Sequence, residues 1–189
     1  MSKSNRWIFI IGLLVGLGIA LAVAIPRLQP HNFYGTVLQS PDKAYNFELD
    51  GSAGQKIRLD QFEGQMVLLY FGYTFCPDVC PATLSELAKA MDDLGNDSED
   101  VQVIMISVDP GRDSPSMLAE YVAHFHPSFL GATGTDEEIA QIATLYGIFY
   151  EKHEGTQATG YLVDHTATVM GIDRDGHLKI VFPFGAPGE

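Results

Sequence analysis

Hydrophobic and polar positions along the chain predict an α/β protein in which strands and helices alternate. Met66–Gly72 is a continuous apolar run of strand length, as expected for a strand that is buried on both faces, and Val101–Val108 is predicted as a second buried strand. Between them, residues 82–94 carry apolar side chains at helical spacing, and Gly95 is a typical helix stop. A strand, a helix and a strand in this order predict the core of a parallel sheet.

A hairpin is predicted at each end of this core. Residues 46–49 and 56–59 alternate and flank a segment that contains two glycines, a pattern typical of a β-hairpin. Near the other end, Thr166–Ile172 and His177–Phe182 are predicted strands joined by an Asp-Arg-Asp-Gly turn. Two further helices are expected before this second hairpin, over residues 115–125 and after Thr135.

The first 25 residues carry the pattern of a membrane anchor. Lys3 and Arg6 precede an uncharged run, Trp7–Ile25, which as a helix would span roughly 28 Å, about the thickness of a bilayer core. Basic residues before such a run favour an N-terminus inside and a domain outside. The alternative is a cleaved signal peptide, because residues 20–24 fit the small-x-small cleavage pattern. Both interpretations predict an exported domain.

We therefore expect three parts: an anchor or signal peptide over residues 1–25, a linker over 26–34 and one domain over 35–189. The expected location is the inner (cytoplasmic) membrane of a bacterium, crossed once, with the domain on the periplasmic or outer side. A mitochondrial transit peptide is not expected, because it would be longer and rich in Arg and Ser.

Composition and charge exclude two classes of function. Hydrophobic residues make up 46% of the chain, which excludes a disordered protein. The net charge is −13, and every acidic residue lies at Asp42 or beyond. Because no basic face or aromatic-basic stripe is present, no nucleic acid is expected as a partner.

Cys76 and Cys80, the two cysteines, stand at the predicted junction of a strand and a helix. Unpaired N–H groups and the helix dipole stabilise thiolates at such a position. We expect Pro81 at the first helical position and Cys80 near the N-cap, so that both sulfurs point to one spot. A strand that leads into a cysteine pair predicts a thioredoxin-like fold. The pair suits either a dithiol/disulfide couple or two soft ligands for Cu(I) or Zn.

His165 is the histidine most suited to join the cysteines. It precedes the strand predicted from Thr166, and strand entry at this place faces the cysteine pair in thioredoxin-like folds. No proline occupies positions 161–170, which leaves room for the ring. Asp164 or a backbone carbonyl is expected to hold the other ring nitrogen. Surface or structural roles are expected for the remaining histidines: His31, His124, His126, His153 and His177.

Three motifs resemble those of the Sco/SenC family of copper proteins. The longest runs from Phe71 to Pro81, and the second is Val163-Asp-His165-Thr followed by a strand and an Asp-Gly turn. Ser107–Pro110 and the downstream Arg112-Asp113 are also similar to the family pattern. The resemblance covers nearly all of the chain from about Tyr34 to Phe184.

The resemblance implies a thioredoxin-like fold, an N-terminal anchor and a domain outside the cytoplasm. It implies that Cys76, Cys80 and His165 bind one Cu(I) or Cu(II) ion. It further implies a metallochaperone, rather than a turnover enzyme, in assembly of the CuA site of cytochrome c oxidase. The expected partners are the copper-site subunit of the oxidase, other periplasmic copper chaperones, and the membrane through the N-terminal helix. The alternative is a thiol–disulfide oxidoreductase in which Cys76 and Cys80 are the redox-active pair.

Two other chemistries are less well supported by the residues. A peroxiredoxin-like peroxidase would need an activated cysteine with a nearby Thr and Arg, for which Thr74 and Arg112 are candidates. A catalytic zinc site of two cysteines, one histidine and a water is chemically feasible, but nothing else in the chain resembles a hydrolase. Asp78, between the cysteines, is a candidate for tuning the site or meeting a partner.

Overall fold

The computed structural model describes residues 11–18, 34–51, 54–156 and 160–188. The chain divides between residues 33 and 34 into two units, which are described separately. In the first unit, residues 11–18 are helical. Within the described residues, no helix is both long enough and apolar enough to cross a membrane. The predicted anchor over 1–25 and linker over 26–34 lie largely outside the described residues.

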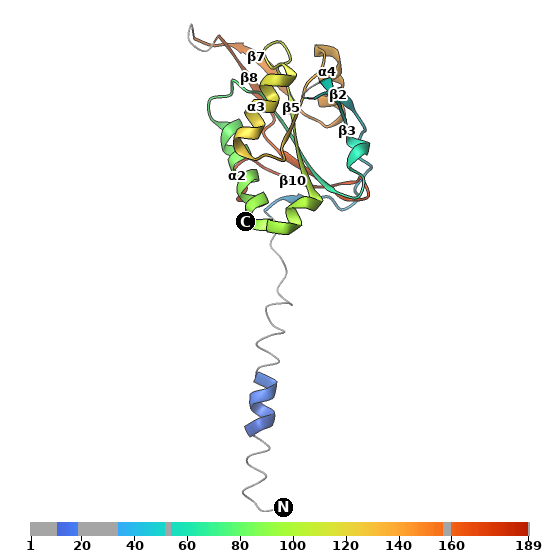
Figure 1. Cartoon of the computed structure of the whole chain (residues 1–189), viewed down its shortest axis with the longest axis vertical. Helices are drawn as coiled ribbons and strands as arrows, with labels where there is room; N and C mark the ends of the chain where they lie inside the picture. Colours follow the sequence, from blue (N-terminus) through green and yellow to red (C-terminus); the bar gives the residue numbers. More distant parts are fainter. Residues whose placement is uncertain (1–10, 19–33, 52–53, 157–159, 189) are drawn as a thin grey trace, which may run out of the picture. The chain divides into compact units, whose positions relative to one another are not determined.

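A six-stranded mixed sheet forms the centre of the second unit, in the order β1-β10-β9-β4-β5-β6 (Figure 1). The strands β4, β5 and β6 run parallel to one another. On the other side of β4, each strand is antiparallel to its neighbour: β9 to β4, β10 to β9 and β1 to β10. This confirms the predicted parallel core completed by an antiparallel hairpin. The strand bounds are Thr36–Val37 (β1), Met66–Gly72 (β4), Val101–Ser107 (β5), Leu130–Ala132 (β6), Val169–Ile172 (β9) and Leu178–Phe182 (β10).

The strand β4 lies inside the sheet because its sequence is apolar on both faces. It pairs with β5 on one side and with β9 on the other. Leu69, Tyr70 and Phe71 are fully buried. Because β4 is paired on both sides, the position of its carboxyl end is fixed. The cysteine loop begins at this end.

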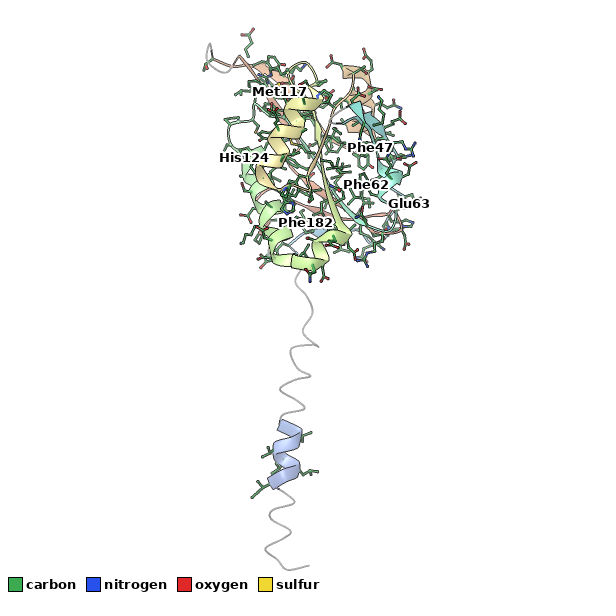
Figure 2. The ribbon with its side chains drawn as sticks, viewed as in Figure 1. Phe47, Phe62, Glu63, Met117, His124 and Phe182 are labelled. Carbon is green, nitrogen blue, oxygen red and sulfur yellow. The ribbon has the colours of Figure 1, made fainter. Side chains whose placement is uncertain are left out.

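Three α-helices flank the sheet. In Figure 1, α2 and α3 lie to the left of the central strands and α4 lies to the right, beside β2 and β3. Side chains fill the space between these layers: Phe47 is buried, whereas Met117 and His124 on α3 are exposed (Figure 2). The helices are Val79–Leu94 (α2), Pro115–Phe125 (α3) and Asp136–Leu145 (α4), and the short 3-10 helices are Leu59–Phe62 (η2) and Gly95–Asp100 (η3).

Local sequence signals account for where the helices begin. Thr135 caps α4 as predicted, and its side chain accepts from the N–H of Glu138 while Glu138 reaches back to the N–H of Thr135. The helix α2 begins at Val79, so that Pro81 occupies its third position and not its first. The predicted position of Pro81 is therefore wrong. The physical reason is that none of the first N–H groups of a helix has an intrahelical partner, so proline is tolerated throughout the first turn.

Two hairpins lie outside the six-stranded sheet. The first joins β2 (Glu48–Asp50) to β3 (Lys56–Arg58) and confirms the predicted N-terminal hairpin. The second joins β7 (Tyr150–Glu154) to β8 (Tyr161–His165) and was not predicted. His153 lies in β7 of this hairpin, opposite Leu162.

The strand predicted from Thr166 also needs correction. His165 is the last residue of β8, and the next strand, β9, begins only at Val169. The chain changes sheets over residues 166–168, where the N–H of Thr166 donates to the carbonyl of Phe149 at 2.9 Å. His165 therefore projects from the end of a separate hairpin.

Candidate metal centre

Three elements bring Cys76, Cys80 and His165 together. Cys76 lies in the loop after β4, Cys80 in the first turn of α2 and His165 at the end of β8. Because β9 runs antiparallel to β4, its first residue, Val169, lies opposite Tyr70 near the carboxyl end of β4. This pairing places the segment after β8 at the edge of the sheet where the cysteine loop begins. The two sulfurs and a ring nitrogen of His165 all lie within 4.8 Å of one another.

The hydrogen bonds of His165 define which ring nitrogen faces the sulfurs. Its Nδ1 lies 3.2 Å from the carbonyl oxygen of Thr166, to which it donates, and its Nε2 lies 3.3 Å from the Sγ of Cys80. Nε2 is therefore the ring nitrogen that faces the cysteines. A backbone carbonyl thus holds the ring, as expected, and Asp164 instead lies 3.2 Å from His153.

The two thiols differ strongly in proton affinity. A hydrogen bond from the Cys80 thiol, assisted by His165 and by backbone N–H groups, lowers the pKa of Cys76 to about 4. One of these groups is the N–H of Cys80, 3.3 Å from the Sγ of Cys76. The neighbouring Cys76 sulfur and burial together raise the pKa of Cys80 far above its ordinary value. At neutral pH the pair therefore carries one negative charge, located on Cys76 at the start of a helix.

Two tyrosines enclose the histidine ring. The rings of Tyr70 and Tyr73 meet the ring of His165 edge-on, with centroid distances of 6.1 and 5.9 Å. The hydroxyl of Tyr70 is buried, lowers the pKa of Cys80 and makes no hydrogen bond of good geometry within the described residues. The sequence pattern did not single out Tyr70, because it lies inside the apolar run of β4.

Buried acids secure the loops around the three residues. Asp113 accepts hydrogen bonds from the N–H of Thr74 at 3.0 Å, the hydroxyl of Thr74 at 2.5 Å and the hydroxyl of Ser107 at 2.6 Å. Asp109 accepts from Arg112 and from the hydroxyl of Tyr161. Thr74 and Arg112, the candidates for peroxidase chemistry, are thus both bonded to buried carboxylates.

The other described histidines do not join the cysteines. His153 lies near Asp164, His126 bonds to Ser128, and His177 lies near Asp173. His124 is exposed on α3, and His31 is outside the described residues. Across the part of the chain that the structure describes, Cys76, Cys80 and His165 form the one group of three potential metal ligands.

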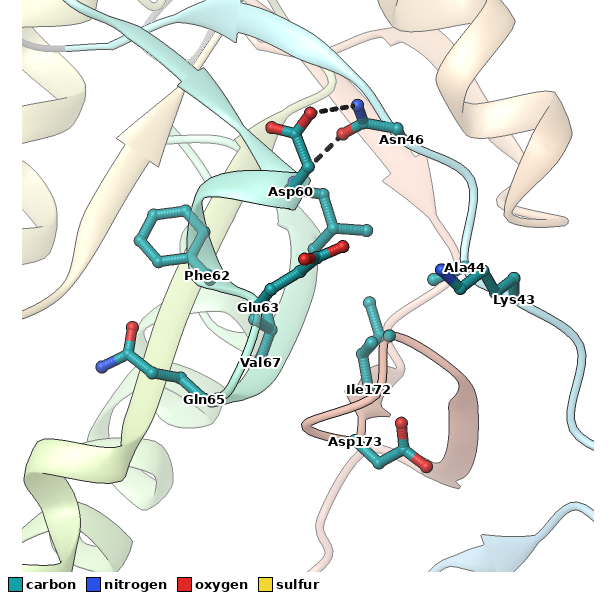
Figure 3. A pocket seen from close by; sticks show the side chains of 12 residues that line it. Lys43, Ala44, Asn46, Asp60, Phe62, Glu63, Gln65, Val67, Ile172 and Asp173 are labelled. Carbon is teal, nitrogen blue, oxygen red and sulfur yellow. Dashed lines mark hydrogen bonds between the residues drawn. The ribbon is translucent and has the colours of Figure 1, made fainter.

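A small pocket elsewhere in the domain does not involve the cysteines (Figure 3). Its volume is about 210 Å³, and none of the three candidate ligands lines it. Asn46 lies on its wall and bonds to both the side chain and the backbone N–H of Asp60. These two bonds join the segment just before β2 to η2.

The donor set of the candidate centre is suited to a soft metal ion. Two sulfurs, one of them ionised at neutral pH, and one imidazole nitrogen with its second nitrogen already bonded match the ligand preferences of Cu(I) or Zn. Binding would displace the proton of Cys80, because thiolates are the ligands. Fold and site together define a thioredoxin-like protein with a thiolate–imidazole centre.

Comparison with known proteins identifies the family. Residues 36–189 match the model of the SCO1/SenC family, and the chain belongs to that family. It is 32% identical to the SCO2-like protein of Rickettsia conorii over 100% of this chain and 94% of the relative.

Solved structures show the same fold. The apo Sco1 protein from Thermus thermophilus is 45% identical, with a TM-score of 0.73 over 81% of this chain and 88% of the other. Bradyrhizobium japonicum ScoI with copper bound is 35% identical, with a TM-score of 0.71 over 78% of this chain and 94% of the other. The predicted thioredoxin-like α/β fold and the predicted family are thereby confirmed.

Proposed function

We propose that this chain binds one copper ion through Cys76, Cys80 and His165 and delivers it during assembly of the CuA site of cytochrome c oxidase. The observation that carries the proposal is the convergence of two sulfurs and one imidazole nitrogen within 4.8 Å. Membership of the SCO1/SenC family supports it, because Sco proteins are described as cytochrome c oxidase assembly proteins. The copper ion is cargo and the protein its carrier.

The donor atoms favour copper over harder metals. Thiolates and an imidazole are soft or intermediate ligands, and no carboxylate belongs to the group of three. A related protein from Bradyrhizobium japonicum holds copper in its solved structure, which supports the same cargo here. Cys76 and His165 are partly exposed, so a partner can approach the site and exchange ligands.

An anaerobic Cu(I) titration against a competing chelator tests the proposal on the full-length chain in detergent. The wild type should bind one ion per chain, and Cys76→Ser or Cys80→Ser should each abolish tight binding. His165→Ala should weaken binding while the two cysteines still form a disulfide. His153→Ala is the matched control and should leave the affinity unchanged. Equal affinities of the His165→Ala variant and the wild type would refute the three-ligand model.

A second candidate function is thiol–disulfide exchange, and the unequal thiols favour it. The Cys76 thiolate is partly exposed, whereas the Cys80 thiol is buried beside it. The Cys76 thiolate can attack a disulfide of an exported protein, forming a mixed disulfide and releasing one substrate thiolate. Cys80 then loses its proton and attacks the Cys76 sulfur. This step forms the Cys76–Cys80 disulfide and frees the second substrate thiol.

The two functions differ in their need for His165. Reduced, metal-free wild type and His165→Ala are mixed with an oxidised peptide that carries the two cysteines of a copper site. If both proteins reduce the peptide equally and His165→Ala also supports oxidase assembly in cells, thiol exchange is the main role. If His165→Ala reduces the peptide but fails in cells, copper delivery is the main role.

We further propose that the N-terminal segment tethers the domain to the bacterial inner membrane, on the periplasmic side. The uncharged run Trp7–Ile25 after two basic residues supports this location. The chain should fractionate with membranes at its full length, and protease added outside spheroplasts should digest the domain. A mature protein that begins after residue 24 would support a cleaved signal peptide instead.

A further inference from the structure

The strand that carries His165 is not part of the main sheet. β7 and β8 form their own two-stranded sheet, and His165 is the last residue of β8 (Figure 1). A two-stranded ribbon has little stability by itself. The position of His165 relative to the cysteines therefore depends on contacts between β8 and the rest of the domain. One of them is the hydrogen bond from the N–H of Val163 to the hydroxyl of Tyr73, at 3.2 Å.

A buried carboxylate at the end of β5 provides a second attachment. Asp109 has no exposed surface. It accepts hydrogen bonds from the Nε of Arg112 at 2.5 Å and from the hydroxyl of Tyr161, the first residue of β8, at 2.6 Å. A buried negative charge requires such partners, because its desolvation is otherwise costly. Asp109 thus holds both Arg112 and the start of the strand that ends at His165.

Arg112 extends this attachment to the cysteine loop. Its Nη1 donates to the carbonyl of Tyr161 at 3.0 Å, and its Cζ lies over the Tyr161 ring, 3.6 Å from the centroid. The same Cζ lies 4.7 Å from the ring centroid of Phe75, the residue before Cys76. A guanidinium group is planar and can stack on aromatic rings while donating in several directions. Arg112 therefore contacts the segments that carry both kinds of candidate ligand.

We propose that Arg112 is a positioning residue that clamps β8 to the cysteine loop and thereby keeps the Nε2 of His165 within reach of the Cys80 sulfur. This inference rests on the proposed copper-binding function for one of its readouts. The other readout needs no metal. A lysine in place of Arg112 would keep a positive charge beside Asp109 but could not stack as a plane and donate to Tyr161 simultaneously.

A double-mutant cycle tests whether Arg112 acts through His165. Cu(I) affinity is measured for full-length wild type, Arg112→Lys, His165→Ala and the double variant. Arg112→Lys should weaken binding by roughly tenfold in the wild-type background, the size typical for groups that orient a metal ligand. In the His165→Ala background it should change affinity less than about twofold, because the ligand it positions is gone. The proposal would be overturned if Arg112→Lys lowered the Cu(I) affinity equally in both backgrounds, or if it did not lower the affinity when His165 is present.

The metal-free readout is the contact between the rings of His165 and Tyr73. NMR cross-peaks between them are expected in the wild type and should weaken in Arg112→Lys, whereas cross-peaks between Tyr121 and Phe125 on α3 should persist. Arg174→Lys is the matched control, because Arg174 forms an exposed pair with Asp100. It should change neither readout.

The two proposals can fail separately. If the wild type binds no copper, the proposed function fails, and weakened His165–Tyr73 cross-peaks would still support the clamp. Unchanged cross-peaks would overturn the clamp whatever the copper affinity. Should Arg112→Lys not fold, Tyr161→Phe removes only the hydroxyl bonded to Asp109. It should weaken the same cross-peaks, and their persistence would count against the clamp.

Discussion

The two cysteines have the same chemistry but different surroundings, and this difference determines which one reacts. Cys76 lies in a loop at the start of α2 and accepts hydrogen bonds, which lower its pKa to about 4. Cys80 is buried beside it and retains its proton. An acid whose pKa is lowered stays ionised until the pH falls to that value. Cys76 is therefore a thiolate over the whole physiological range.

Alkylation of the reduced, metal-free protein should reveal this asymmetry. Iodoacetamide should label Cys76 well before Cys80 at pH 6, and the labelling rate of Cys76 should fall about tenfold per pH unit below pH 4. Mass spectrometry of the digested protein measures both rates. Cys80→Ala removes the thiol that donates to Cys76 and should raise the pH at which Cys76 labelling is half-maximal. Cys80→Ser keeps a hydroxyl donor and should raise this midpoint less. A wild-type midpoint near 8.5 would contradict this assignment.

At the residue scale the sequence predicted the candidate ligands but not what surrounds them. The spacing of Cys76 and Cys80 and the absence of proline near His165 made these three residues candidates, the resemblance to the Sco/SenC family implied that they act as one set, and the fold brings them together. Tyr70 was not distinguishable, because a tyrosine in an apolar strand looks like any core residue. The role of Arg112 was not predictable either, since it depends on contacts with segments far apart in the chain.

At the scale of elements, a buried carboxylate ties the cysteine loop to the end of β5. Asp113 is fully buried and bonds to the backbone and hydroxyl of Thr74 and to the hydroxyl of Ser107. These bonds fix the chain just before Cys76. Removing the carboxylate would leave one buried donor, on Ser107, and two part-buried donors, on Thr74, without their acceptor, which costs more than losing a single hydrogen bond.

Asp113→Ala should therefore lower the free energy of unfolding by about 3 kcal/mol, measured by urea denaturation of the metal-free protein. Asp113→Asn should cost less than half of this, because an amide oxygen can still accept and its NH₂ can donate to the Thr74 hydroxyl. Asp93→Ala, on the exposed face of α2, is the matched control and should change stability by less than about 0.5 kcal/mol. If Asp113→Ala and Asp93→Ala changed the free energy of unfolding by similar amounts, the hydrogen bonds of Asp113 would not be important for stability.

The sequence predicted mainly those elements in which the pattern of apolar positions reflects which side chains are buried. β4 is a continuous apolar run, β5 is mostly apolar, and α4 begins after the predicted cap, Thr135. The hairpin of β7 and β8 was missed because the side chains of β7 are mostly exposed, which leaves no apolar alternation to detect. β1 and β6 are only two and three residues long, too short for any periodicity.

At the scale of the whole molecule, the centre joins a well-paired sheet to a hairpin outside that sheet. Cys76 and Cys80 follow β4, which is paired on both sides, whereas His165 belongs to β8, which within the described part of the chain pairs with β7 alone. Strands with fewer partners open locally at a lower free energy than the global unfolding of the domain. A metal ion held by both parts would be lost whenever the hairpin opens, so binding must stabilise the hairpin against opening.

Hydrogen exchange can measure this coupling site by site. In the metal-free protein, amides of β8 should exchange faster than those of β4 and β5. With free Cu(I) at 100 times its dissociation constant, exchange in β8 should slow by about 100-fold, because opening then requires release of the ion. Exchange in β6 should change little, since it is an edge strand that is separated from β4 by β5. His165→Ala should remove the slowing in β8. If β8 already exchanges as slowly as β5 without copper, then the hairpin is not an independent unit, and copper would stabilise only the domain as a whole.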